Sequence, residues 1–127
     1  MRRIRSLIVA AAGLLACSEA FNPDLTPSDF YGVWGSTDGA RLTISNTRTY
    51  FESSCWAGEF VVPIIVDGEQ FVASGSLNAT HGTETRIANI GGSLNGDALH
   101  VTVTPVTFQL GPYVMVRDLP VTIPACP

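Results

Sequence analysis

The sequence predicts an all-β protein, a small antiparallel barrel of about eight strands that follows a cleaved signal peptide, with a β-sandwich as the alternative. Three observations support this prediction. Short apolar or alternating runs are separated by turn residues over most of the chain. No segment beyond the first 17 residues has a helical period. Asp67-Gly68 and Asn95-Gly96 are typical two-residue hairpin turns, which favour successive neighbouring strands.

Residues 1–16 have the layout of an export signal. Three arginines precede a short apolar run over residues 7–16. The run is too short to cross a bilayer, which needs roughly 20 apolar residues. It ends directly at Cys17 in the order Leu-Leu-Ala-Cys, which resembles the bacterial lipobox. This resemblance implies that the chain is cleaved after residue 16 and that Cys17 carries the lipid.

A lipidated Cys17 would place the protein in the cell envelope, in contact with a membrane through its acyl chains. Each buried acyl methylene contributes about 0.8 kcal/mol, so two or three chains hold a protein firmly. Ser18 does not resemble the aspartate-type signal for inner-membrane retention. In a bacterium with two membranes we therefore expect the outer membrane, facing the periplasm. Residues 17–29 form the lipidated cysteine and a tether, and residues 30–127 a single β-barrel domain.

The mature part of the chain is acidic. After residue 16, four arginines stand against eleven acidic residues, with no lysine, which gives a formal charge of −7. Such a surface does not attract a phosphate backbone, so the composition argues against nucleic acid as a partner.

The cysteine count fits one lipid anchor and one disulfide. With Cys17 acylated, Cys55 and Cys126 remain as a pair in an oxidising compartment, and we expect a bridge between them. A metal site and a nucleophilic thiol are the rival interpretations. Both rank lower, because the chain has no C-x-x-C motif and neither histidine lies near a cysteine in the sequence. A bridge to Cys126 would tie down the C-terminal tail.

The expected strands cover, in order, residues 30–35, 40–46, 47–55, 59–66, 70–79, 86–94, 99–105 and 113–119. The run over 59–66 is apolar throughout, so we expect it to be buried on both faces or to lie at the barrel closure. Pro63 within it belongs at an edge or a bulge, because proline cannot donate to a ladder. Residues 56–58 are expected to form a turn, and Gly91-Gly92 a bulge or a sharp bend.

The alternating pattern also predicts which side chains point inward. They are Val33, Leu42, Ile44, Phe60, Val62, Ile64, Phe71, Leu77, Leu94, Leu99, Val101 and Val103. Nearly all are medium or large, and a chain this short has little apolar surface to spare. We therefore predict a filled interior, with any partner bound on outer surfaces or loops.

Residues 29–34, Asp-Phe-Tyr-Gly-Val-Trp, contain a G-x-W motif that resembles the first strand of lipocalins and related calycin barrels. In those barrels the tryptophan plugs one end, often beneath an arginine from the last strand. The resemblance implies these parts for Trp34 and Arg117.

A second likeness covers nearly the whole mature chain. The order of conspicuous residues resembles an uncharacterised family of small exported bacterial lipoproteins, and it runs Gly32, Trp34, Gly35, Cys55, Gly58, Pro63, Asp67-Gly68, His81-Gly82, Arg86, Gly92, Leu94, Gly96, Gly111-Pro112 and Cys126. This likeness implies an autonomous domain with a Cys55–Cys126 bridge. It brings no catalytic residues to this chain.

The candidate site residues do not have the spacing in the sequence that is typical of catalytic residues. His81 lies in an expected turn and His100 on the outward face of an expected strand, so we interpret both as solvated surface residues. A metal site built from them and Glu84 would need the fold to bring all three together. We expect no catalytic residues, no metal and no cofactor.

The function class that remains is a membrane-anchored extracytoplasmic lipoprotein acting as a binding or envelope-accessory module. One alternative is an inhibitor of an extracytoplasmic enzyme, either a protease or a lysozyme. A second alternative is a lipocalin-like carrier of a small apolar ligand, which an interior filled by side chains would disfavour.

Overall fold

The structure, a computed structural model, describes residues 24–127. The expected signal peptide, Cys17 and the first part of the tether lie outside the described residues. Within this range, no helix combines the length and the apolar character that crossing a membrane requires.

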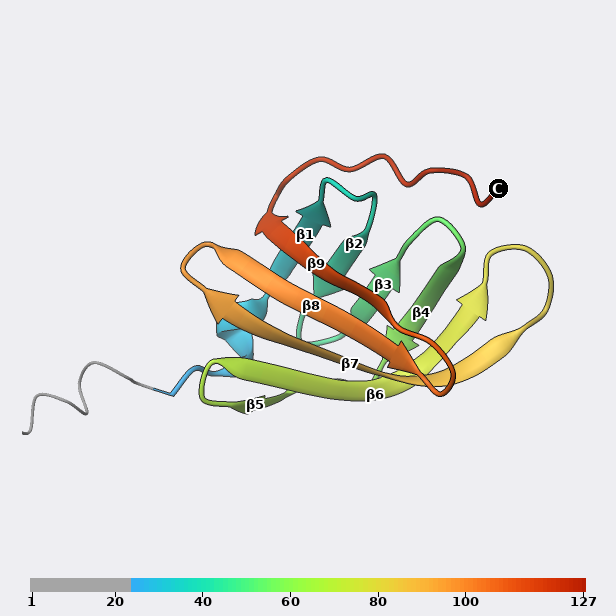
Figure 1. The fold of residues 1–127 in the computed structure, drawn as a ribbon. Helices are drawn as coiled ribbons and strands as arrows, with labels where there is room; N and C mark the ends of the chain where they lie inside the picture. The colour runs from blue at the N-terminus through green and yellow to red at the C-terminus, as the bar shows by residue number, and fades with distance from the viewer. Residues whose placement is uncertain (1–23) are drawn as a thin grey trace, which may run out of the picture.

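Eight of the nine strands close into an antiparallel barrel. Each barrel strand pairs with the next in the order β1-β2-β3-β4-β6-β7-β8-β9, and β9 returns to β1 (Figure 1). The barrel is thereby confirmed over the sandwich. The elements are the 3-10 helix η2 (Pro27–Phe30), then β1 (Gly32–Ser36), β2 (Arg41–Ile44), β3 (Thr49–Glu52), β4 (Trp56–Phe60), β5 (Ile65–Asp67), β6 (Gln70–Ala79), β7 (Thr85–Asn95), β8 (Ala98–Pro105) and β9 (Leu110–Arg117).

The prediction of a single strand over 59–66 is wrong, because this segment contributes to two strands, β4 and β5. β4 already begins at Trp56, so residues 56–58 are strand rather than turn, and it ends at Phe60. The chain then leaves the ladder around Pro63, which has no N–H to donate, and re-enters it as β5. β6 is long enough to pair with β5 along its first part and with β4 along its second. Val61 is 60% exposed in the break, so the run is not buried on both faces.

Of the two alternatives predicted at Gly91-Gly92, a bulge or a sharp bend, the bulge is wrong. Both glycines pair in continuous register with β6 on one side and β8 on the other. The irregular position lies elsewhere, between Val101 and Val103, where β8 pairs with β9. Close packing explains why residue 92 is a glycine, because a Cβ there would lie 2.6 Å from the ring of Phe71.

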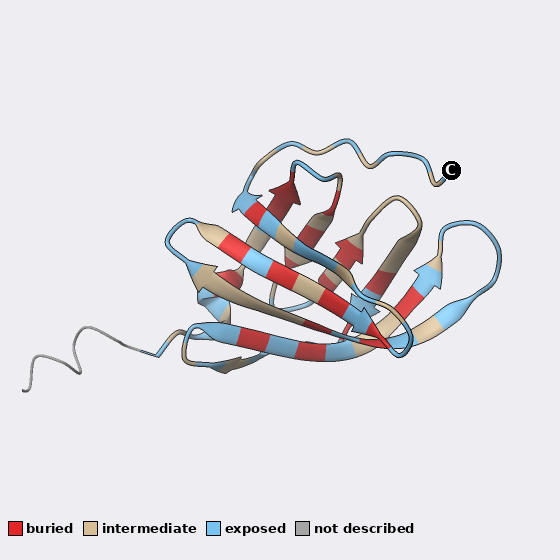
Figure 2. Cartoon of the chain, viewed as in Figure 1, coloured by how far each residue is buried: buried red, intermediate tan, exposed pale blue. Residues whose placement is uncertain are grey.

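The barrel interior is a single apolar cluster, and the inward face of each strand alternates with an outward face, as Figure 2 shows along β8. Most of the expected inward side chains are buried, namely Leu42, Ile44, Phe60, Ile64, Phe71, Leu77, Leu99, Val101 and Val103. Val62 and Leu94 are only partly buried. The prediction that Val33 points inward is wrong. Its side chain is 41% exposed, because Trp34 takes the inward position in β1. The pattern did not identify Phe30, Phe51, Ile90 and Met115, which are almost fully buried.

Candidate functional site

One end of the barrel, which we call the N-terminal end, is closed by η2 and the aromatic side chains behind it. Pro27 opens this short helix, with a φ that suits a first helical position. Phe30 is fully buried and meets the ring of Phe71 edge-on, with the ring centroids 5.2 Å apart. The indole Nε1 of Trp34 donates to the backbone oxygen of Phe30 over 2.9 Å, so the only polar atom of this buried ring has a partner.

The structure brings Trp34 and Arg117 together at the N-terminal end. The two residues are partners in the pairing of β1 with β9. The Arg117 guanidinium lies 4.3 Å from the centre of the Trp34 ring, a cation–π distance. Its Nη2 also donates to the backbone oxygen of Asp29 over 2.9 Å. Gly32 leaves room for this arrangement, because a Cβ there would lie 3.0 Å from the guanidinium.

A hollow of about 460 Å³ lies beside this pair. Within residues 24–127, the other three arginines each form an ion pair with a glutamate, whereas Arg117 has no carboxylate partner. The hollow nevertheless carries more negative than positive charge, because Asp29 and Asp97 line it together with Arg117. It therefore has no net attraction for an anion.

The expected disulfide is confirmed. The sulfurs of Cys55 and Cys126 are 2.00 Å apart, their Cα atoms 4.8 Å apart, and 71 positions separate them in the sequence. The Cα separation lies within the ordinary range for a protein disulfide. The bridge fixes the end of the C-terminal tail to the connection between β3 and β4.

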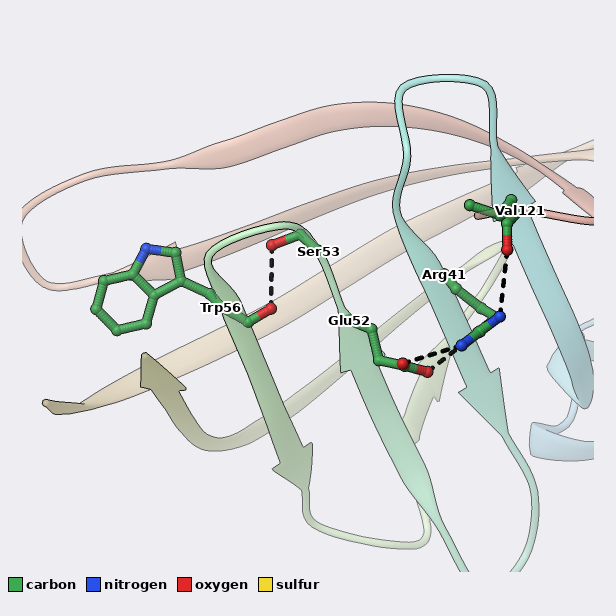
Figure 3. A network of polar contacts seen from close by, with 5 residues as sticks. All are labelled: Arg41, Glu52, Ser53, Trp56 and Val121. Atoms are coloured by element: carbon green, nitrogen blue, oxygen red, sulfur yellow. Dashed lines mark hydrogen bonds and ion pairs between the residues drawn. The ribbon is translucent and has the colours of Figure 1, made fainter. Parts of the chain in front are cut away.

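The tail reaches this bridge by crossing the outer side of β1 and β2. Gly35 makes the crossing close, because a Cβ there would lie 2.3 Å from the backbone oxygen of Leu119. Arg41 on β2 donates to the backbone oxygen of Val121 over 3.4 Å and forms a bidentate ion pair with Glu52 at 3.0 Å (Figure 3). The hydrogen bonds that the Arg41 guanidinium donates to the Glu52 carboxylate raise the pKa of Arg41. The tail thus acts as a strap that crosses β1 and β2 and ends at the β3–β4 connection.

The opposite end, which we call the loop end, is covered by loops that contact one another and the ends of β4 and β7. The ring of Trp56 lies 5.3 Å from that of Phe108, in the β8–β9 loop. Arg86 donates to the Thr107 hydroxyl over 2.7 Å, which ties this loop to β7. The backbone N–H of Thr80 donates to the oxygen of Cys55 over 2.9 Å. The loop end is therefore cross-linked by side-chain and backbone contacts as well as by the disulfide.

The histidines lie apart from each other. His81 is exposed in the β6–β7 connection at the loop end, and His100 is exposed on β8. Among residues 24–127, no group of three or more histidine, cysteine or carboxylate side chains is placed to hold a metal ion.

A groove of about 450 Å³ lies on the outer face of β6, β7 and β8. The strand register places outward residues side by side in rows across the three strands. Gln70, Ser93 and His100 form one row, and Val72, Gly91 and Thr102 form the next. The sequence placed His100 on an outward face but did not reveal the groove, because the groove depends on the register of three strands. We call this feature the outer groove.

Comparisons of the chain with protein-family models, with curated proteins and with solved structures found no match. The function is therefore inferred from the residues of this chain alone.

Proposed function

We propose that the protein is a membrane-anchored extracytoplasmic lipoprotein, held by acyl chains on Cys17, and that it acts as a binding or envelope-accessory module. Its partner binds the outer surface or the loops rather than the barrel interior. The filled interior supports the second part of this proposal, binding on the outer surface, and the anchor rests on the lipobox-like sequence before Cys17. Usual ligand pockets have volumes of about 300–1,000 Å³. Here the barrel space holds large side chains that are at most 1% exposed, among them Trp34, Phe51, Phe71 and Met115.

The point at which the chain enters the barrel supports the anchored orientation. The backbone N–H of Leu25 donates to the oxygen of Gly68 over 3.3 Å, which places the incoming chain beside the β5–β6 turn. Residues 17–24 span at most about 25 Å when fully extended, at roughly 3.6 Å per residue. An acylated Cys17 would therefore keep the N-terminal end near the membrane. The loop end and the outer strand faces would stay open to a partner.

Inhibition of an extracytoplasmic protease or lysozyme is the second candidate function, and the β8–β9 loop favours it. Val106 in this loop is 84% exposed, while the loop is held by the Trp56–Phe108 and Arg86–Thr107 contacts. An exposed apolar side chain on an ordered loop costs little entropy to bind, which suits insertion into an enzyme cleft.

Anchoring is tested by metabolic labelling with an alkyne fatty acid, followed by separation of membranes from soluble protein. We expect label and membrane association in the native chain, and loss of both in Cys17→Ala. Cys55→Ala is the matched control, because it also removes one cysteine but should keep the label. Label that persists in Cys17→Ala would contradict the anchor.

Binding on the outer surface is tested by placing a photoreactive amino acid at outward-facing sites of the chain in intact envelopes. Val106 samples the loop end and Thr102 samples the outer groove. We expect discrete adducts at one or both of these sites. Asn46, exposed in the β2–β3 turn at the N-terminal end, serves as the control. No adduct at either test site, together with an apolar small molecule that co-purifies with the protein, would support a carrier instead.

A further inference from the structure

No neighbouring atom requires a glycine at position 91. It lies inside β7 with strands paired on both sides. Its φ is not positive, unlike that of the turn glycines. A Cβ there would meet only the backbone oxygen of Phe71 at 3.5 Å and a methyl of Val72 at 3.8 Å, which are ordinary contacts. A glycine inside a strand is destabilising relative to alanine. Such a glycine often marks a bulge, a tight bend of a barrel strand, or a site that a ligand or another backbone approaches closely, and the continuous register at Gly91 leaves no bulge there.

Gly91 is also the floor of the outer groove. The missing side chain leaves a depression between Val72 on β6 and Thr102 on β8, which are its direct partners across the sheet. Polar side chains surround this floor, and they are Gln70, Asn89, Ser93, His100, Thr102 and Thr104. Within residues 24–127, no hydrogen bond joins any of these six side chains to another residue. Some other surface groups of this kind are paired, as in the 2.8 Å bond that the Thr85 hydroxyl donates to Asn78.

The chemistry of the lining selects a neutral ligand. No lysine, arginine, aspartate or glutamate lines the outer groove, so a charged ligand would find no counter-charge there. Amide and hydroxyl groups both donate and accept hydrogen bonds, as the hydroxyl groups of a sugar also do. The Cα of Gly91 and the side chain of Val72 offer a small apolar surface for the C–H face of a sugar ring.

An extended peptide fits the outer groove less well. Peptides that add to a sheet bind along a free strand edge through backbone hydrogen bonds. The backbone groups of β7 are already engaged by β6 and β8 on both sides. A peptide lying here would contact only side chains.

We infer that the outer groove binds a short segment of a neutral oligosaccharide. This inference rests on the proposed binding role and specifies its surface and its ligand class. The outer groove is an open depression of about 450 Å³ on the sheet surface, which suits a short segment that stays partly exposed to solvent. Sugar hydroxyls would bond the rows of Asn, Gln, Ser, Thr and His side chains while one ring lies over Gly91.

The test is a titration of the full-length chain, exported and purified in mild detergent, with three neutral tetrasaccharides. These are the β-1,4-linked oligomers of N-acetylglucosamine and of glucose, and the α-1,4-linked oligomer of glucose. We expect saturable binding of at least one, measured by calorimetry, with amide chemical-shift changes centred on β7 and β8.

Two variants assign that binding to the outer groove. Gly91→Val fills the floor with a residue that strands favour, and we expect at least tenfold weaker binding without a lower melting temperature. Ser76→Val is the matched control, because it adds the same side chain to the outer face of β6 beyond the groove, and binding should not change. Asn89→Ala with Thr102→Ala removes bonding groups without adding volume and should weaken binding in the same direction.

The inference is overturned if no tetrasaccharide binds, or if Gly91→Val binds as tightly as the native chain. Either result would leave the proposed anchored binding role intact if the fatty-acid label and the photo-adducts are found. If the native chain takes up no fatty-acid label but still binds a tetrasaccharide, the anchor is overturned and the assignment of the outer groove stands.

Discussion

Removal of the Cys55–Cys126 bridge should cost about 4 kcal/mol of unfolding free energy. The change is the double variant Cys55→Ser with Cys126→Ser, which keeps the size of both side chains. The bridge closes a loop across 71 sequence positions. In the chain-entropy model, a closed loop of this length restricts the unfolded state by about 4 kcal/mol at 25 °C. Small domains have a total stability of about 5–15 kcal/mol, so the variant should fold but with a narrow margin.

The assay is thermal and urea unfolding of the native chain, followed by circular dichroism with and without a reductant. For a domain of this size, a loss of 4 kcal/mol corresponds to a melting temperature lower by roughly 15–30 °C. Reduction should lower the native chain to the level of the double variant, and the variant itself should not respond to the reductant. A double variant within about 1 kcal/mol of the oxidised native chain would refute the reasoning that the bridge limits the unfolded state.

Three further predictions concern the strap, the core and one tyrosine. Gly35→Ala should destabilise the protein by roughly 1–3 kcal/mol in urea unfolding, because the new Cβ would collide with the tail; unchanged stability would contradict the strap. Phe51→Ala should cost about 3–5 kcal/mol, because the ring is fully buried, and a loss below about 1 kcal/mol would mean that the interior is loosely packed. Burial, and then the Asp38 carboxylate, raise the pKa of Tyr113, so the native state holds this proton more tightly than the unfolded state. Stability should therefore fall as the pH rises above about 10, and Tyr113→Phe should flatten this fall in alkaline unfolding curves. An unchanged slope in that variant would contradict the assignment.

The barrel and the disulfide could be predicted from the sequence because both depend on signals that single residues carry. Alternation and hairpin turns indicate successive antiparallel strands, and two cysteines remain for one bridge once Cys17 is set aside. The Trp34–Arg117 contact was implied by a resemblance, and the structure brings the two side chains together.

The failures have a common physical cause. Alternation defines two faces but not which face is inward, so the expectation for Val33 was wrong while its neighbour Trp34 is buried. A continuous apolar run cannot show where a strand ends, and the break between β4 and β5 is set by how β6 divides its pairing. The outer groove depends on which residues of three strands lie side by side, which is a tertiary property.

The most direct test of the central claim, that a partner binds outside a filled barrel, is titration with a fluorescent fatty acid. The exported Cys17→Ala chain is the suitable sample, because it has no acyl groups of its own at that position to compete with the probe. Interior packing by Trp34, Phe51 and Phe71 predicts no saturable binding. Saturable one-to-one binding, together with a crystal structure showing an open apolar cavity of roughly 300 Å³ or more, would contradict the account and support a carrier.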